Sequence, residues 1–226
     1  MRSAIFDLDG TLVDSAPSVV AALNAALAVE GAAPLGSDAI RGMIGRGAAV
    51  LMGDATEAAG LGRKAELEAR LLTAFLVEYE AASPLTRLHD GVAEALDRLS
   101  AAGWRLGLVT NKSDGPVRST LHHVGLDGRF EAIVTGDTAT RLKPDPAPLR
   151  AVQDALGGYP AVYIGDSEVD AAAANAAPMP FLLYTEGYRR TPASSLVHIA
   201  EFNCFSVLPE LAEAVLTMPA SDRMGA

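Results

Sequence analysis

The second half of the chain alternates between short apolar runs and stretches with helical periodicity, and this alternation restricts the possible folds most. Strands that alternate with helices form βαβ units, in which the strands run parallel and helices cover both faces of the sheet. The expected strands are 104–110, 132–135, 161–164 and 181–184, and the expected helices are 92–101, 116–124, 146–156 and 168–176. The sequence therefore predicts an α/β fold with a parallel sheet that has helices on both faces.

One further strand, residues 3–6, is separated from this region by a long segment with helical periodicity, residues 16–82. Because one strand cannot form a sheet alone, it must join the sheet of the second half. We therefore expect a discontinuous α/β domain of residues 1–15 and 83–218, interrupted by an all-helical domain. Residues 219–226 are expected to form a disordered tail.

Composition limits the possible partners and the compartment. The 226 residues carry a formal net charge of −10, which disfavours nucleic acids and anionic membranes and indicates a small-molecule partner. Cys204 is the one cysteine and lies in an apolar stretch that predicts a buried strand, which suggests a reducing compartment. The sequence has no run of about 18 apolar residues and no signal-peptide pattern. We expect a cytoplasmic protein, as a monomer or homodimer.

Two aspartates, Asp7 and Asp9, directly follow the first expected strand. Side chains two residues apart on a strand point to one face, so the two carboxylates can converge. Neighbouring carboxylates persist only if a cation lies between them, a proton is shared, or each has a different role. A local turn or a helix N-cap would also explain the pair, so the motif alone leaves both interpretations open.

Polar residues also follow two other expected strands: Thr110 and Asn111 follow residue 109, and Asp166 follows 161–164. Because ligands bind beyond the carboxyl ends of parallel strands, we expect these groups at one edge of the sheet. Lys143 precedes Pro144, in a segment that suits a helix start and so places an ammonium where anions are favoured. An ordinary Pro-rich loop is the alternative for this lysine.

A second acidic pair, Asp166 and Asp170, is spaced to lie on one face of the first turn of a helix. Helix capping and the helix dipole would explain each residue separately. The pair opposite Asp7 and Asp9 nevertheless argues for a metal. Carboxylate oxygens match Mg²⁺ rather than zinc, since the sequence has no cluster of Cys and His residues.

These groups together suit a phosphoryl dianion. A divalent cation, Lys143, and donors from Thr110 and Asn111 would neutralise and bind its oxygens. Asp7 could then attack phosphorus to form an aspartyl-phosphate. Asp9 is placed to protonate the leaving oxygen and later to take a proton from water.

Four segments resemble, in order and spacing, the four motifs of haloacid dehalogenase-type phosphatases: residues 7–15, 110–112, 143–146 and 165–170. The resemblance implies a Rossmann-like core with an inserted helical cap, residues 16–82, and Mg²⁺ as the cofactor. It also implies a role for each matching residue: Asp7 as nucleophile, Asp9 as general acid and base, Thr110, Asn111 and Lys143 as phosphate binders, Asp7, the Asp9 carbonyl and Asp166 as metal ligands, and Asp170 as their support.

Within this superfamily, residues 43–52 and 185–189 look like the phosphoglycolate phosphatase family, which implies hydrolysis of 2-phosphoglycolate to glycolate and phosphate. Ala177-Pro178 and His89-Asp90 depart from the usual pattern, outside the four motifs. In the insertion, Arg46 lies between two glycines and offers a fork suited to the substrate carboxylate. A solvated arginine in a helix-helix turn is the alternative.

Other activities are less well matched. A phosphatase or phosphosugar mutase of the same superfamily, acting on another small phosphorylated metabolite, shares the nucleophile, acid and cap. The dehalogenase branch lacks the second acid, whereas Asp9 is present here. A phosphoacceptor receiver domain is the remote alternative, and both Asp9 and the long helical insertion argue against it.

Overall fold

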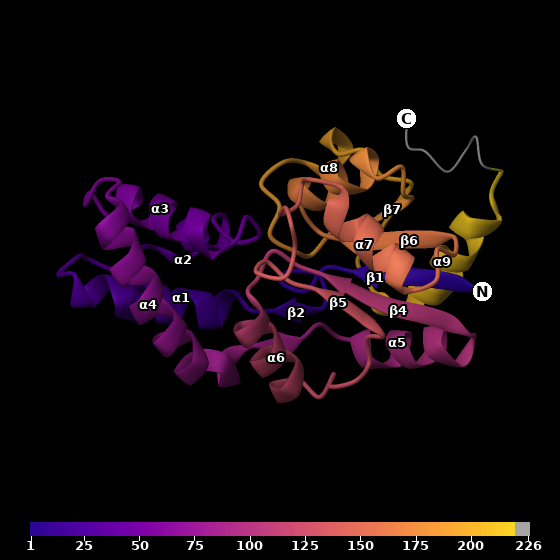
Figure 1. Cartoon of the computed structure of the whole chain (residues 1–226), viewed down its shortest axis with the longest axis horizontal. Helices are drawn as coiled ribbons and strands as arrows, with labels where there is room; N and C mark the ends of the chain where they lie inside the picture. The colour runs from indigo at the N-terminus through magenta and orange to yellow at the C-terminus, as the bar shows by residue number, and fades with distance from the viewer. Residues whose placement is uncertain (220–226) are drawn as a thin grey trace.

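A six-stranded sheet lies at the centre of the larger part of the molecule, on the right in Figure 1. The computed structural model describes residues 1–219, so most of the tail predicted at 219–226 lies outside the described residues. All neighbouring strands of the sheet are parallel. Their order is β5 (Ala132–Val134), β4 (Trp104–Val109), β1 (Arg2–Phe6), β6 (Ala161–Gly165), β7 (Phe181–Tyr184) and β8 (Ala200–Phe202). The prediction of an α/β fold with a parallel sheet is confirmed.

Helices cover both faces of this sheet, which explains why β1, β4 and β6 are buried along almost their whole length. Side chains of α5 (Val92–Ala101), α6 (Asp114–His123) and α9 (Leu208–Thr217) pack with Phe6 and Leu108 on one face. On the other face, α7 (Ala147–Ala155) and α8 (Glu168–Ala176) pack with Ile5 and Tyr163. The expected helices 92–101 and 168–176 coincide with α5 and α8.

The prediction of a buried strand around Cys204 is wrong. Strand β8 ends at Phe202, and a 3₁₀ turn, Phe205–Val207, follows. Phe202 and Phe205 are both buried against Tyr184, whereas Cys204 is exposed. The two aromatic rings three residues apart account for the apolar pattern, and Cys204, which lies between them as the residue before the turn, is exposed.

Four helices form the smaller part of the molecule, on the left in Figure 1. They are α1 (Ala16–Val29), α2 (Ser37–Arg41), α3 (Ala48–Ala58) and α4 (Ala65–Ala82). Leu23, Met52, Leu71 and Phe75 belong to a hydrophobic cluster of these helices that is separate from the two clusters of the sheet. No helix in the described part of the chain has both the length and the apolar character to cross a membrane.

The chain passes between the two parts twice, through two short strands that lie side by side. β2 (Val13–Asp14) leads into the helices and β3 (Arg87–Leu88) leads back, and they pair antiparallel. Next to this pair, the Ser18 hydroxyl lies 3.0 Å from the Ala82 carbonyl oxygen and 2.7 Å from the Thr86 hydroxyl. The start of α1 and the segment that leads into β3 are therefore joined by hydrogen bonds next to the β2–β3 pair.

Candidate active site

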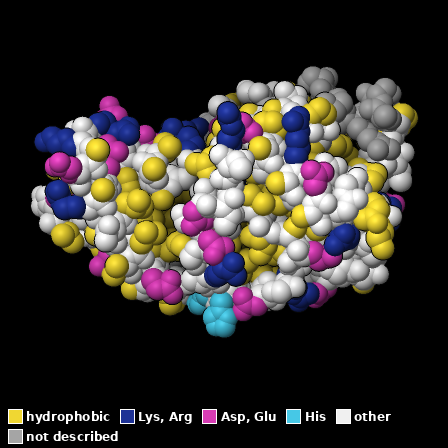
Figure 2. Space-filling model, in the orientation of Figure 1, with side chains coloured by type: hydrophobic (Ala, Val, Ile, Leu, Met, Phe, Trp, Pro, Cys, Tyr) yellow, Lys and Arg dark blue, Asp and Glu magenta, His cyan; other side chains and the backbone are white. Residues whose placement is uncertain are grey.

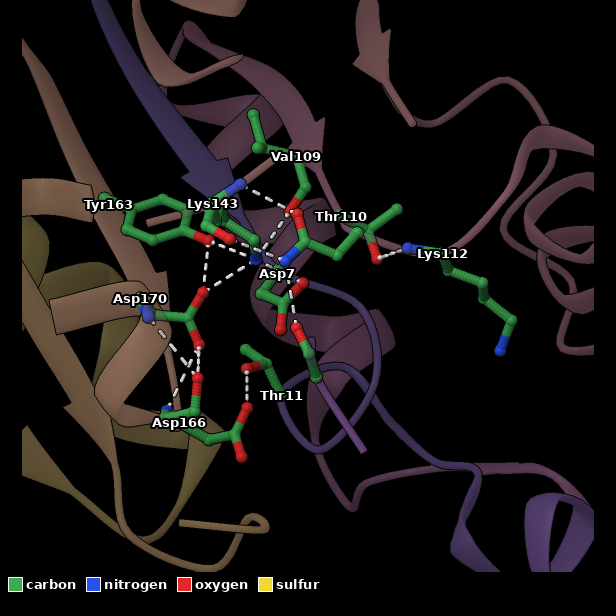
Figure 3. Close-up of polar contacts among 12 residues, drawn as sticks. Asp7, Thr11, Val109, Thr110, Lys112, Lys143, Tyr163, Asp166 and Asp170 are labelled. Carbon is green, nitrogen blue, oxygen red and sulfur yellow. Dashed lines mark hydrogen bonds and ion pairs between the residues drawn. The ribbon is translucent and has the colours of Figure 1, made fainter. Parts of the chain in front are cut away.

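The predicted site residues that follow β1, β4 and β6 meet at the carboxyl edge of the sheet. These strands are direct neighbours with β1 in the middle, so Asp7 lies between Thr110 and Asp166. All three side chains are buried. Figure 3 shows them together with Lys143 and Asp170, which come from the loop before α7 and from α8.

Lys143 is the centre of a buried network of charges. Its Nζ lies 2.8 Å from Asp7 Oδ1 and 2.7 Å from Asp170 Oδ1, and it donates to the Tyr163 hydroxyl at 2.8 Å and the Val109 carbonyl at 3.2 Å. The lysine side chain is only 2% exposed. An ordinary solvated loop is therefore excluded for this residue, and the ammonium lies against Asp7.

Asn111 holds this lysine through its backbone. Its side-chain amide donates to the Lys143 carbonyl at 3.0 Å and to the Gly45 carbonyl at 3.0 Å, and its Oδ1 accepts from the Lys143 amide at 2.9 Å. The Thr110 hydroxyl accepts from the Lys112 amide at 3.2 Å. The side chain of Asn111 thus positions Lys143 and reaches the loop between α2 and α3.

Asp166 is fully buried and does not cap α8. The N-cap is Ser167, which forms a capping box with Asp170. The carboxylate of Asp166 instead accepts from the Thr11 hydroxyl at 2.9 Å and from the Tyr188 amide at 2.6 Å. One carboxylate oxygen of Asp170 accepts from Ser167 at the helix start and the other accepts from Lys143 and Tyr163, so helix capping accounts for only one of the two oxygens.

Three acids form a group that could hold a metal ion. Carboxylate oxygens of Asp7, Asp166 and Asp170 all lie within 4.8 Å of one another. Burial is the main cause that raises the pKa of Asp7 to about 7, against the lowering effect of Lys143. Burial, and then the charges of Asp170 and Asp7, raise the pKa of Asp166 well above its usual range. One ammonium does not balance three buried carboxylates, and an all-oxygen ligand set with excess negative charge fits Mg²⁺.

The side chain of Asp9 is not part of this group of three acids and has partners of its own. Its Oδ1 accepts from the Ser15 hydroxyl at 2.6 Å and from Lys112 Nζ at 2.7 Å. Lys112 also donates to the hydroxyl of Tyr79, on α4, at 2.5 Å. Burial lowers the pKa of Lys112, but Asp9 and Tyr79 raise it more, so the pKa lies above its ordinary value.

A cavity lies where the sheet edge meets the helices, and Asp7, Asp9 and Thr110 line its polar side. Its apolar side comes from the helical part, where Figure 2 also shows hydrophobic side chains gathered next to the α/β part. The residues on the apolar side of the cavity are Val19, Met43, Ile44, Leu51, Phe75 and Leu76.

Arg46 lies outside both the lining of this cavity and the network around Lys143, although Gly45 and Gly47 on either side do line the cavity. The Arg46 guanidinium forms an ion pair with Asp54, and its side chain is 42% exposed.

The sequence reasoning missed Lys112, Tyr79, Tyr163 and Thr11. Lys112 and Thr11 did carry a local signal, since Lys112 follows Thr110 and Asn111, and Thr11 follows Gly10 in the first motif. The two tyrosines carried none, because they reach the site from a helix and a strand whose own patterns indicate only packing.

Comparisons with known proteins show which family this chain is similar to. Residues 4–184 match the family model of haloacid dehalogenase-like hydrolases. A phosphoglycolate phosphatase of Cereibacter sphaeroides is 46% identical over 217 residues, which cover 96% of this chain and 100% of that protein. One from Rhodospirillum rubrum is 42% identical and covers 100% of this chain and 95% of that protein. A crystal structure of a predicted phosphoglycolate phosphatase from Haemophilus somnus has a TM-score of 0.88 at 29% identity, covering 92% of this chain and 96% of that one.

Proposed function

The chain belongs to the haloacid dehalogenase-like hydrolase family, and we propose that it is a Mg²⁺-dependent phosphatase that cleaves 2-phosphoglycolate to glycolate and phosphate. The observation that carries the proposal is the environment of Asp7. This carboxylate lines the cavity and at the same time contacts the buried ammonium of Lys143 at 2.8 Å. The relatives named phosphoglycolate phosphatase support the choice of substrate, because their similarity extends over nearly the whole chain.

In the proposed reaction, Asp7 attacks phosphorus and the bond from phosphorus to the glycolate oxygen breaks, which leaves an aspartyl-phosphate. Asp9 gives the leaving oxygen its proton, and later takes a proton from the water that hydrolyses the intermediate. Lys143 opposes the charge that develops on the phosphoryl oxygens. Thr110 contacts these oxygens from the cavity wall, and Asn111 keeps Lys143 in place.

The proposed metal ligands are the carboxylates of Asp7 and Asp166 and the backbone carbonyl of Asp9, with Asp170 as their support. The three buried carboxylates support this assignment through their short mutual separation and their unbalanced charge. When bound, Mg²⁺ would neutralise the phosphoryl group and so allow an anionic nucleophile to approach it.

We further propose that residues 16–82 form a cap domain on a core of residues 1–15 and 83–218. Their separate hydrophobic cluster and their contribution to the cavity support this division. Closing the cap over the sheet edge would exclude water from the reaction. Arg46 is not part of the proposal, because its guanidinium pairs with Asp54.

The net charge of −10 supports a small phosphorylated metabolite as the partner, rather than a nucleic acid or a membrane. We propose a cytoplasmic enzyme that acts as a monomer or homodimer.

Phosphate release from 2-phosphoglycolate by the purified protein, with and without Mg²⁺, tests the proposed function. We expect turnover of 2-phosphoglycolate to require Mg²⁺. We also expect its kcat/KM to exceed the kcat/KM of sugar phosphates. Asp7→Asn should lower kcat by about 10³-fold or more, since the nucleophile is lost. Absence of phosphate release, or an isomerised sugar phosphate as the preferred product, would overturn the proposal.

A further inference from the structure

Lys112 places a positive charge on the wall of the cavity. Among the described residues that line the cavity, it is the only one with a cationic side chain. Its side chain is 11% exposed, so the ammonium is largely withdrawn from bulk water. An anionic group of a ligand in the cavity would therefore meet one accessible cation.

The ammonium is fixed from two sides. Asp9 Oδ1 accepts from it at 2.7 Å on the sheet side, and the Tyr79 hydroxyl lies at 2.5 Å on the helical side. The ammonium also lies 4.5 Å from the centre of the Tyr79 ring. An ammonium has three donor hydrogens, and these two contacts use two of them. One donor remains for a further acceptor.

The other lysine of the site, Lys143, has no donor hydrogen left for a further acceptor. Lys143 is surrounded by the oxygens of Asp7, Asp170, Tyr163 and Val109, behind the nucleophile. The proposed substrate carries two anionic groups, a phosphoryl group and a carboxylate. Lys143 does not line the cavity, and its contact with Asp7 places it next to the phosphoryl group that Asp7 would attack.

We propose that Lys112 binds the carboxylate of the substrate and that Tyr79 positions it for this contact. The inference rests on the proposed function. It assigns the specificity for a carboxylate-bearing substrate to a residue at the edge of the sheet, next to the proposed general acid Asp9. The Tyr79 contact also gives the helical part a share in selecting the substrate.

The test compares 2-phosphoglycolate with ethyl phosphate, which has a methyl group in place of the carboxylate. Lys112→Met should raise the KM for 2-phosphoglycolate and lower its kcat/KM by about 10- to 100-fold, because a charge-assisted hydrogen bond is lost. The kcat/KM for ethyl phosphate should change by less than about threefold. Lys112→Arg should recover part of the loss, and Tyr79→Phe should show a smaller loss confined to 2-phosphoglycolate. Lys64→Met removes an exposed lysine and should leave the kcat/KM of both substrates unchanged.

Two results would overturn the inference while leaving the proposed function intact. In the first, the wild type prefers 2-phosphoglycolate and Lys112→Met keeps that preference. In the second, Lys112→Met lowers the kcat/KM of both substrates equally, which would show that Lys112 acts through Asp9. A wild type without preference for 2-phosphoglycolate over ethyl phosphate would instead overturn the proposed function, and this inference with it. Circular dichroism of each variant checks folding, and Lys112→Arg and Tyr79→Phe keep the test valid if Lys112→Met fails to fold.

Discussion

At the scale of single residues, two glycines determine the space available to Asp166. A Cβ atom on Gly187 would lie 2.2 Å from Asp166 Oδ2, and one on Gly10 would lie 2.6 Å from the same oxygen. Gly10 also has a backbone φ of +86°, a value that residues with a side chain rarely adopt. The acid can therefore be fully buried only because neither neighbour has a side chain.

Gly187→Ala should therefore displace Asp166 and weaken Mg²⁺ binding. We expect the Mg²⁺ concentration for half-maximal activity to rise about 10-fold or more, as for other changes that misplace a metal ligand. Titration of activity and of thermal stability with Mg²⁺ measures this. Gly115→Ala is the matched control, since a Cβ there meets nothing within 4 Å. Equal Mg²⁺ dependence of the two variants would contradict the expectation.

The raised pKa values of Asp7 and Asp166 predict how Mg²⁺ and pH act together on stability. The pKa of Asp7 is about 7 in the folded protein without metal, whereas its ordinary value is 3.8. The folded state therefore binds this proton more tightly than the unfolded state, and the stability that the proton contributes is lost as the pH rises from about 4 to about 7. Mg²⁺ must displace the proton, which costs about 1.4 kcal/mol per pH unit below the folded pKa.

The gain in Tm on adding Mg²⁺ should thus be larger at pH 7.5 than at pH 5.5, conditions that lie about half a unit above and 1.5 units below the pKa of Asp7. Calorimetry with chelator and with excess Mg²⁺ measures the difference. Asp166→Asn should remove most of the gain at both pH values. A gain that does not depend on pH would argue against protonated carboxylates in the metal-free site.

At the scale of elements, the loop after β7 links the acidic site to the start of the helical part. The Tyr188 amide donates to Asp166, while the Tyr188 hydroxyl accepts from the amides of Ser15 and Ala16 and donates to Asp14. One residue thus connects the buried acid with the passage from β2 into α1.

Tyr188→Phe should leave the Ser15 amide without its acceptor and remove the shorter of the two hydrogen bonds of the Ala16 amide, which keeps Asp14 Oδ1 at 3.3 Å. Both amides are buried, so the free energy of unfolding should fall by about 1–3 kcal/mol. Urea denaturation measures the loss. Tyr159→Phe is the control, because the Tyr159 hydroxyl has no hydrogen-bond partner among residues 1–219. Similar losses in the two variants would reject the role of these hydrogen bonds.

The elements that the sequence predicts well are those whose pattern is set by burial on a regular face. Helices α5 and α8 have the predicted bounds, and the strand-end argument correctly brings Asp7, Thr110 and Asp166 together. The prediction for Cys204 is wrong because two buried aromatics, one at the end of β8 and one at the start of a 3₁₀ turn, give the same apolar run as a strand. Contacts such as Lys112 with Tyr79 depend on how two distant elements pack, which no local pattern encodes.

At the scale of the whole molecule, the helical part and the sheet have separate hydrophobic clusters. Leu71 is fully buried in the cluster of the helical part, and Leu96, on α5, is 1% exposed in a cluster of the sheet. Two such clusters joined by short connections can open independently.

Leu71→Ala should destabilise its surroundings by about 2–5 kcal/mol and should speed hydrogen exchange in α1 and α4. Exchange in β1 and β4 should stay nearly unchanged. Leu96→Ala is the reciprocal control, with faster exchange in the sheet. Hydrogen exchange read by mass spectrometry distinguishes the two patterns, and uniform acceleration in both variants would show that the molecule opens as one unit.

The pairing of β2 with β3 has a consequence for how such a protein can change over evolution. Asp14 and Arg87 are direct cross-strand partners, so the chain leaves the α/β part and returns to it at adjacent positions. Everything between these two residues occupies what is geometrically the tip of a β-hairpin. A segment of another length or architecture could be grafted at this tip without a change in sheet order, and a new substrate could be acquired by exchanging a single continuous stretch of gene.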